Sequence, residues 1–220
     1  MISKNLLYLL ILSCCFFSCE KEKITIPSVR SQVGIFGGSQ SLSIYSKPVK
    51  DKWAKLFNVD IVDCGVVGAG AGLWQENTIS NQIIYNRPFD VYILWCSTND
   101  IGALDIKLDD ENDCKTQSGG LKYCVDLIHN KNKNAQIVLF TSMYVPSARI
   151  LKKMPDFVDK QISFCEKYSI SYLNQLNPNV LDESDFQKDK LHMSSSAGYW
   201  KLEPRQTDFL TNYVFKKYAN

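Results

Sequence analysis

Short, unbroken apolar runs alternate along this chain with stretches whose apolar residues have helical spacing, and this alternation most constrains the fold. Strands that are buried on both faces show such runs, because neither face needs polar residues. The alternation with helices predicts an α/β fold with a parallel sheet between helical layers. The expected strands are 33–37, 59–62, 91–95, 137–140 and 171–173, and the expected helices are 47–57, 77–85, 119–131, 155–168, 196–202 and 205–217.

Two local expectations accompany these elements. Pro204 interrupts the last helical pattern, and a proline inside a helix removes one N–H donor and clashes with the preceding turn. We therefore expect two separate helices on either side of Pro204. In the helix expected over 47–57, we expect Trp53, Leu56 and Phe57 to lie on one side.

The composition fits one folded domain and excludes one class of partner. The 220 residues are 45% hydrophobic and 22% charged, so a sizeable core is available. Lys and Arg total 25 against 23 Asp and Glu, a formal charge of +2. So small a charge argues against nucleic-acid binding through bulk electrostatics.

The N-terminus is typical of an export signal. Lys4 precedes an apolar stretch over 6–17, which ends at Ser18-Cys19 before a charged segment. A small residue followed by Cys resembles a bacterial lipoprotein cleavage site with Cys19 as the lipidated residue, although Cys14 is a competing match. A plain cleaved signal and an uncleaved anchor are the alternatives.

The lipoprotein interpretation divides the chain into a signal peptide over 1–18, a tether over 19–31 and a folded domain over 32–220. We expect an exported lipoprotein on the periplasmic or cell-surface side. Its only membrane contact would be the N-terminal lipid anchor.

Cysteine and histidine spacing gives no metal-ligand pattern, so we expect no metal and no cofactor. Export permits disulfides, but the domain has an odd number of cysteines, so at least one thiol stays free. A bond from Cys114 to Cys124 or Cys165 remains open. Cys64 and Cys96 lie in strand-like runs, where buried free thiols are common.

Glycine and polar residues follow three of the expected strands. Ligands of parallel sheets bind at the carboxyl ends of the strands, an edge that we call the rim. Ser39 follows the first strand, Gly68 lies in a glycine-rich stretch after the second, and Asn99 follows the third. The glycine spacing matches neither a dinucleotide fingerprint nor a phosphate loop.

The two histidines differ in their expected position. His129 lies late in a helix that leads into the fourth strand, which places it at the opposite edge of the sheet. His192 comes after the last strand, three residues beyond Asp189, in a segment that can fold back over the rim. His192 can therefore act as the base for a serine nucleophile, with Asp189 orienting its ring.

A serine nucleophile also needs donors for the oxyanion of an acyl-transfer intermediate. The backbone N–H groups of Ser39 and Gly68 and the side-chain amide of Asn99 could supply three. These donors come from the ends of three strands.

In this order the residues resemble the SGNH (GDSL-type) hydrolases, which are named for Ser, Gly, Asn and His in four sequence blocks. Ser39 matches the first block, Gly68 the second, Asn99 the third, and Asp189 with His192 the last. The resemblance implies a flavodoxin-like three-layer α/β/α sandwich with a five-stranded parallel sheet. It also implies a catalytic triad of Ser39, Asp189 and His192.

Two positions depart from the family pattern. Gly38 stands where the family has Asp before the nucleophile, and Ser97 replaces the Gly of the third block. The missing Asp is not part of the triad, so activity is not excluded. Ser97 adds a side chain that can narrow the site or shift Asn99. The resemblance spans about residues 32–218, so we expect the folded domain over 32–220 to be an SGNH hydrolase domain.

Together the resemblance and the export signal imply a serine esterase that works through an acyl-Ser39 intermediate. We expect it to remove an acyl group, most simply acetyl, from a carbohydrate or another small ester. A lipase or lysophospholipase and an inactive glycan-binding lipoprotein on the same fold remain alternatives. Trp74, Trp95 and Trp200 could stack on sugars, although core packing is favoured, above all for Trp95 within a strand.

Overall fold

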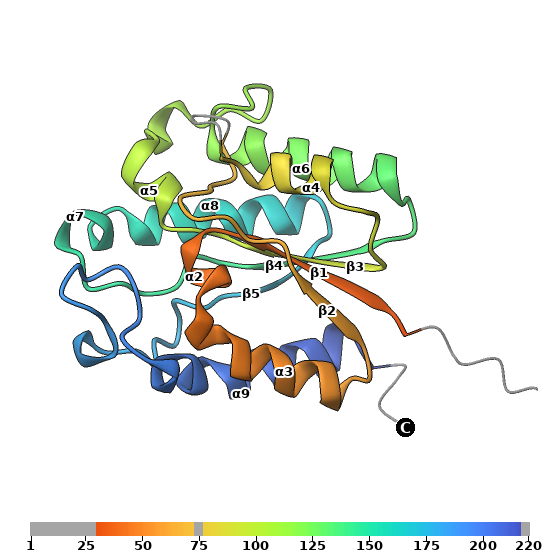
Figure 1. The fold of residues 1–220 in the computed structure, drawn as a ribbon. Coiled ribbons are helices and arrows are strands. Elements are labelled where there is room, and N and C mark those ends of the chain that lie inside the picture. Colours follow the sequence, from red (N-terminus) through yellow and green to blue (C-terminus); the bar gives the residue numbers. More distant parts are fainter. Residues whose placement is uncertain (1–29, 73–76, 217–220) are drawn as a thin grey trace, which may run out of the picture.

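The computed structural model describes residues 30–72 and 77–216. Within these residues, five strands form one sheet in the order β2-β1-β3-β4-β5, and every neighbouring pair is parallel (Figure 1). The strands are β1 (Gln32–Gly37), β2 (Asp60–Asp63), β3 (Val91–Trp95), β4 (Gln136–Phe140) and β5 (Ser171–Leu173). The predicted α/β fold with a parallel sheet is confirmed, and each strand lies within one residue of its predicted bounds.

Helices cover both faces of the sheet. In Figure 1, α3 and α9 lie on one side, and α4, α6 and α8 lie on the other. The described helical segments are α2 (Ser39–Leu42), η1 (Ile44–Ser46), α3 (Lys47–Leu56), α4 (Ile79–Tyr85), α5 (Asn99–Ala103), η2 (Ile106–Leu108), α6 (Gln117–Lys131), α7 (Ala148–Leu151), α8 (Met154–Lys167), η3 (Glu183–Asp185) and α9 (Ser196–Tyr213). The sandwich is therefore three-layered.

Strand β3 shows why the apolar runs are unbroken. Val91, Ile93 and Trp95 belong to the core that includes residues of α3 and α9. Tyr92 and Leu94 belong to the second core, which includes residues of α4 and α6. All five side chains are buried, because alternate residues of a strand point to opposite faces and both faces are covered.

The prediction of a helix break at Pro204 was wrong, because α9 continues through this residue. Pro204 lies on the exposed side of the helix, whereas Leu202, Gln206 and Leu210 are buried against the rest of the domain. The proline leaves the Trp200 carbonyl without its helical donor, and Trp200 is itself exposed, so water can satisfy that oxygen. Burial of the inner face therefore outweighs the local cost of proline.

The predicted placement of Leu56 beside Trp53 and Phe57 was also wrong. Trp53 and Phe57 are 0% and 7% exposed, but Leu56 is 55% exposed. Trp53 and Phe57 are four positions apart, so both lie on the side of the helix that faces the core. Leu56, the last residue of α3, points to solvent instead.

The five cysteines in the described part of the chain are free thiols, so neither of the disulfides left open by the sequence forms here. Burial raises the pKa of the Cys64 thiol to about 12 and that of Cys165 to about 12. Burial also raises the pKa values of Cys96 and Cys124. These four groups therefore stay protonated at neutral pH and act as small apolar side chains.

Among the residues that the structure describes, no helix is both long enough and apolar enough to cross a membrane. The predicted signal peptide, and the tether up to residue 29, lie outside the described residues.

We expect Pro204→Ala to stabilise the protein. Alanine restores a helical N–H and favours the helix, while losing the smaller entropic benefit that proline confers on the unfolded chain. The expected gain in unfolding free energy is about 2 kcal/mol, measured by urea denaturation. Pro155→Ala is the matched control, because Pro155 lies in the first turn of α8, where its missing N–H costs nothing. An equal gain in both variants would contradict this account of α9.

Candidate active site

The nucleophile candidate lies on a sharp turn from β1 into α2. Strand β1 ends at Gly37, Gly38 is extended, and Ser39 is the first residue of α2 (Figure 1). A Cβ atom at Gly38 would lie 2.6 Å from Ser97 Oγ and 2.9 Å from Ala69 O, so the turn has no room for a side chain there. Ser39 is half-buried at the rim.

Ser39, His192 and Asp189 form one hydrogen-bonded chain. Ser39 Oγ lies 2.9 Å from His192 Nε2, and His192 Nδ1 lies 2.7 Å from Asp189 Oδ2. With Nδ1 donating to the carboxylate, Nε2 presents its lone pair to the serine hydroxyl. The structure thus brings together the three predicted triad residues, although 153 positions separate Ser39 from His192.

Local hydrogen bonds explain the spacing of Asp189 and His192. Asp189 Oδ1 accepts the backbone N–H groups of Leu191 at 2.9 Å and His192 at 3.1 Å. Lys190 has a positive φ of 57°, which closes the turn. One carboxylate oxygen therefore shapes the loop while the other holds the imidazole.

These contacts set the charge state of Asp189. Burial by itself would raise the pKa of Asp189, but hydrogen bonds from the His192 ring and from the Leu191 and His192 N–H groups outweigh it. The pKa of Asp189 therefore lies below its usual value. The carboxylate stays ionised at neutral pH and can stabilise a positively charged imidazole.

The loop that carries His192 is held at both ends. Phe186 and Met193 form an antiparallel bridge, and both side chains are buried. Gln187 N donates to His192 O at 2.8 Å across the same loop. These contacts connect the two ends of the loop just before α9 begins. The position of His192 is therefore fixed relative to this helix.

Gln40 and Tyr199 tie this loop to the nucleophile turn, and sequence reasoning missed both. The buried Gln40 side chain donates to Leu191 O at 3.3 Å, and Tyr199 OH on α9 donates to Gln40 O at 2.7 Å. Gln40 directly follows Ser39, which was the available signal. The partners of both residues lie more than 150 positions away, so the sequence could not name them.

Two of the three predicted oxyanion donors, Gly68 and the Asn99 amide, lie on neighbouring segments of the rim. Gly68 has a positive φ of 79°, which favours glycine, and it precedes Ala69. Asn99, the first residue of α5, donates through Nδ2 to Ala69 O at 3.1 Å and to Ser97 Oγ at 2.6 Å. The third and second sequence blocks are thus in direct contact.

Asp100 fastens the glycine-rich loop. Its carboxylate is completely buried and accepts the N–H groups of Ala71 at 2.7 Å and Gly72 at 3.3 Å. A Cβ atom at Gly70 would lie 2.2 Å from Asp100 Oδ1, so this close approach requires glycine. Sequence reasoning gave Asp100 no role of its own.

His129 is far from this constellation, as predicted. It is exposed in the last turn of α6 and lines a surface hollow with Gln136 and Ser171, the first residues of β4 and β5. It therefore lies at the amino edge of the sheet, opposite the rim.

The tryptophans give little support to sugar stacking. Trp95 is buried in the core, and Trp74 lies outside the described residues. Trp200 is 41% exposed, but Lys52 Nζ of α3 lies 5.8 Å from the centre of its ring.

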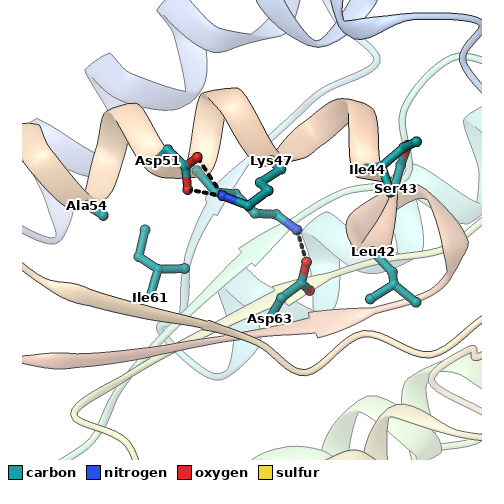
Figure 2. A pocket seen from close by; sticks show the side chains of 9 residues that line it. Leu42, Ser43, Ile44, Lys47, Asp51, Ala54, Ile61 and Asp63 are labelled. Atoms are coloured by element: carbon teal, nitrogen blue, oxygen red, sulfur yellow. Dashed lines mark hydrogen bonds and ion pairs between the residues drawn. The ribbon is translucent and has the colours of Figure 1, made fainter.

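A hollow of about 300 Å³ lies beside α2, between α3 and the edge strand β2 (Figure 2). Its lining begins at Leu42, three residues after Ser39. Its charged residues are paired with each other: Lys47 with Asp51, and the buried Lys50 with Asp63. Burial lowers the pKa of Lys50 although Asp63 opposes the shift.

Within residues 30–72 and 77–216, the structure shows no cluster of three or more His, Cys, Asp or Glu side chains that could hold a metal ion.

No family model and no curated protein matches the sequence. Among solved structures, the esterase EstA from Pseudoalteromonas is 16% identical, covers 84% of this chain and 98% of its own, and has a TM-score of 0.61. The acetylxylan esterase Axe2 from Geobacillus stearothermophilus, solved as a catalytic mutant, is 14% identical, with 82% and 94% coverage and a TM-score of 0.59. A proposed GDSL-like lipase from Bacteroides ovatus is 14% identical, with 82% and 98% coverage and a TM-score of 0.56.

The chain has the SGNH hydrolase fold. The predicted flavodoxin-like sandwich with a five-stranded parallel sheet is thereby confirmed. At these identities the likeness establishes the architecture alone.

The lowered pKa of Asp189 predicts a pH-dependent contribution to stability. A carboxyl whose pKa is depressed by folding stabilises the protein above its unfolded pKa, and this contribution is lost as the pH falls through the folded pKa. Asp189→Asn should therefore lower the melting temperature at pH 7, and the gap from wild type should narrow below about pH 4. The gap should be modest, because the side chain is 44% exposed.

Thermal melts followed by circular dichroism at pH 7 and pH 3 would measure this gap. Asp126→Asn is the control, because Asp126 is an exposed carboxylate in a surface ion pair with Lys122. A gap for Asp189→Asn that is the same at both pH values would contradict the assignment.

Proposed function

We propose that this protein is a serine esterase of the SGNH hydrolase type. The observation that carries the proposal is the hydrogen-bonded chain from Ser39 Oγ through the His192 ring to Asp189, located at the rim. A serine hydroxyl is a weak nucleophile, and a neutral imidazole within hydrogen-bond distance activates it. The orienting carboxylate completes the set of roles that acyl transfer requires.

The first half-reaction forms an acyl-enzyme. Ser39 Oγ attacks the ester carbonyl carbon while His192 Nε2 takes the hydroxyl proton. The carbonyl electron pair moves onto oxygen, and the tetrahedral intermediate then collapses. The bond from the carbonyl carbon to the alcohol oxygen breaks, and His192 returns the proton to the leaving alcohol.

The second half-reaction consumes one water. Water attacks the acyl-Ser39 carbonyl while His192 takes its proton, and the intermediate releases the free acid as the proton passes back to Ser39 Oγ. Asp189 stays ionised throughout and stabilises the imidazolium. The net reaction is ester plus water giving acid plus alcohol.

We assign the oxyanion donors to Ser39 N–H, Gly68 N–H and the Asn99 amide. The positive φ of Gly68 and the contact of Asn99 with Ala69 support a shared location for the last two. Removal of one such donor typically costs about 100-fold or more in kcat.

For the substrate we propose a short acyl group, acetyl first, on a carbohydrate or another small ester. One protein with the same fold is described as an acetylxylan esterase, and others as a lipase and an esterase. The export signal predicted over 1–18 supports an extracellular polymer or glycan. A long-chain lipase is the alternative, and a series of acyl lengths separates the two.

We expect Ser39→Ala and His192→Ala each to lower kcat on p-nitrophenyl acetate by at least about 1,000-fold, because each removes the nucleophile or its base. His129→Ala is the matched histidine control and should retain activity, since His129 lies at the opposite edge of the sheet. Initial rates at pH 7.5 measure all three. Full loss in His129→Ala with activity in His192→Ala would contradict the site.

Covalent labelling separates the enzyme from an inactive binding protein. A fluorophosphonate should modify wild-type Ser39 and leave Ser39→Ala unmodified, as intact mass shows. The EstA structure of the same fold is described as inhibited by monoethylphosphonate. A wild-type protein that neither labels nor turns over short esters, yet binds acetylated glycans, would be the glycan-binding alternative.

We further propose that the domain is exported and held to a membrane by a lipid on Cys19. The support is the apolar run over 6–17 followed by Ser18-Cys19. Cys19→Ala should shift the protein from the membrane fraction to the soluble fraction of an expressing bacterium. An unchanged membrane fraction would reject lipidation at Cys19.

A further inference from the structure

Ser97 is a buried hydroxyl at the centre of the rim with no role in the proposed triad. It lies between the end of β3 and the start of α5, and it is 2% exposed. Its Oγ accepts the Asn99 backbone N–H at 3.1 Å and the Asn99 Nδ2 at 2.6 Å. One hydroxyl therefore holds both the backbone and the side chain of Asn99.

These two bonds, with that to Ala69, determine the orientation of the Asn99 amide. Nδ2 carries two hydrogens, and its two acceptors are Ser97 Oγ and Ala69 O. The amide plane is thus defined by one acceptor on its own loop and one on the glycine-rich loop. Without Ser97 Oγ, a single acceptor would remain, and the side chain could rotate.

Ser97 Oγ occupies space that a side chain at position 38 would need. A Cβ atom built on Gly38 would lie 2.6 Å from Ser97 Oγ and 2.9 Å from Asn99 Nδ2. Real Cβ atoms do not come this close, so Ser97 can adopt its position only because residue 38 has no side chain. The two departures from the family pattern, Gly38 and Ser97, therefore occupy the same space and are linked.

We propose that Ser97 is a positioning residue that orients the Asn99 amide for the oxyanion, in a site where Gly38 leaves room for its hydroxyl. The proposal rests on the proposed function. An amide whose plane is already fixed pays a smaller reorganisation cost when negative charge develops on the substrate oxygen. In the free enzyme one Nδ2 hydrogen of Asn99 is donated to Ser97 Oγ. As the oxyanion forms, Asn99 can share this hydrogen between Ser97 Oγ and the substrate oxygen.

A double-mutant cycle tests whether Ser97 acts through Asn99. Ser97→Ala should lower kcat on p-nitrophenyl acetate about tenfold with little change in KM, a part of the loss expected from removal of the whole donor. Asn99→Ala should lower kcat about 100-fold, and adding Ser97→Ala to it should change kcat less than about twofold. Unchanged kcat in Ser97→Ala, or the same tenfold loss in the Asn99→Ala background, would overturn the proposal.

Ser142→Ala is the matched control for folding. Ser142 is also fully buried, two residues after the end of β4, and its hydroxyl donates to the Ser97 carbonyl at 3.3 Å. It should lower the melting temperature at least as much as Ser97→Ala does, yet keep kcat within about twofold of wild type. Equal losses of kcat in the two variants would mean that Ser97 has only a structural role.

A measurement that needs no turnover keeps this proposal separate from the proposed function. In ¹⁵N–¹H spectra of the purified protein, the Asn99 side-chain amide should exchange with water slowly in wild type and faster in Ser97→Ala. Equal exchange in the two proteins would overturn the proposal. A wild type that neither labels at Ser39 nor hydrolyses esters would defeat the proposed function, and the exchange rates would then decide the role of Ser97.

Discussion

The parallel pairing of β1 with β3 is the constraint on which the candidate site depends. Val33 pairs with Val91 and the register continues to Gly37 and Trp95, so the two strands end together. Two segments that are 60 positions apart, at Ser39 and Asn99, therefore start their helices at the same edge. A shift of one residue in this register would exchange the β3 side chains between the two cores, and the packing of both cores prevents this.

Packing in the same core also positions His192. Helix α9 packs against α3 on one face of the sheet, and Trp53 of α3 donates to Thr207 of α9 at 3.0 Å. The bond from Tyr199 to Gln40 then fixes the start of α9 beside the nucleophile turn. His192 precedes this helix by four residues and has little freedom of position, so its hydrogen bond to Ser39 follows from packing remote from the reaction.

Two carboxylates near the site, those of Asp189 and Asp100, are each held by several hydrogen bonds. The Asp189 carboxylate is held by the imidazole and two N–H groups, and the buried Asp100 carboxylate accepts from two further N–H groups. Each carboxylate therefore shapes a loop as well as carrying charge. Small residues leave the space that these close polar contacts require. Gly70 makes room for the Asp100 carboxylate, and Gly38 makes room for Ser97 Oγ.

The layer architecture and the candidate residues of the site can be predicted from the amino-acid sequence alone. Runs such as 91–95 are apolar without interruption and too short for a helix, which favours buried strands, whereas the helices show apolar residues at helical spacing. The spacing of Asp189 and His192 is likewise local, because the carboxylate bonds to N–H groups two and three residues later. Local patterns of this kind can be read from neighbours in the chain.

Other features depend on contacts between distant parts of the chain: the continuation of α9 through Pro204, the exposure of Leu56, the hydrogen bonds of Gln40 and Tyr199, and those from Asn99 to Ser97 Oγ. Helix propensity opposes the first, but burial of Leu202 and Leu210 overrides it. The bonds of Gln40 and Tyr199 join atoms that are more than 150 residues apart. Whether Ser97 crowds or supports Asn99 depends on the room left by Gly38, which follows another strand, β1, because close packing lets distant neighbours determine each rotamer.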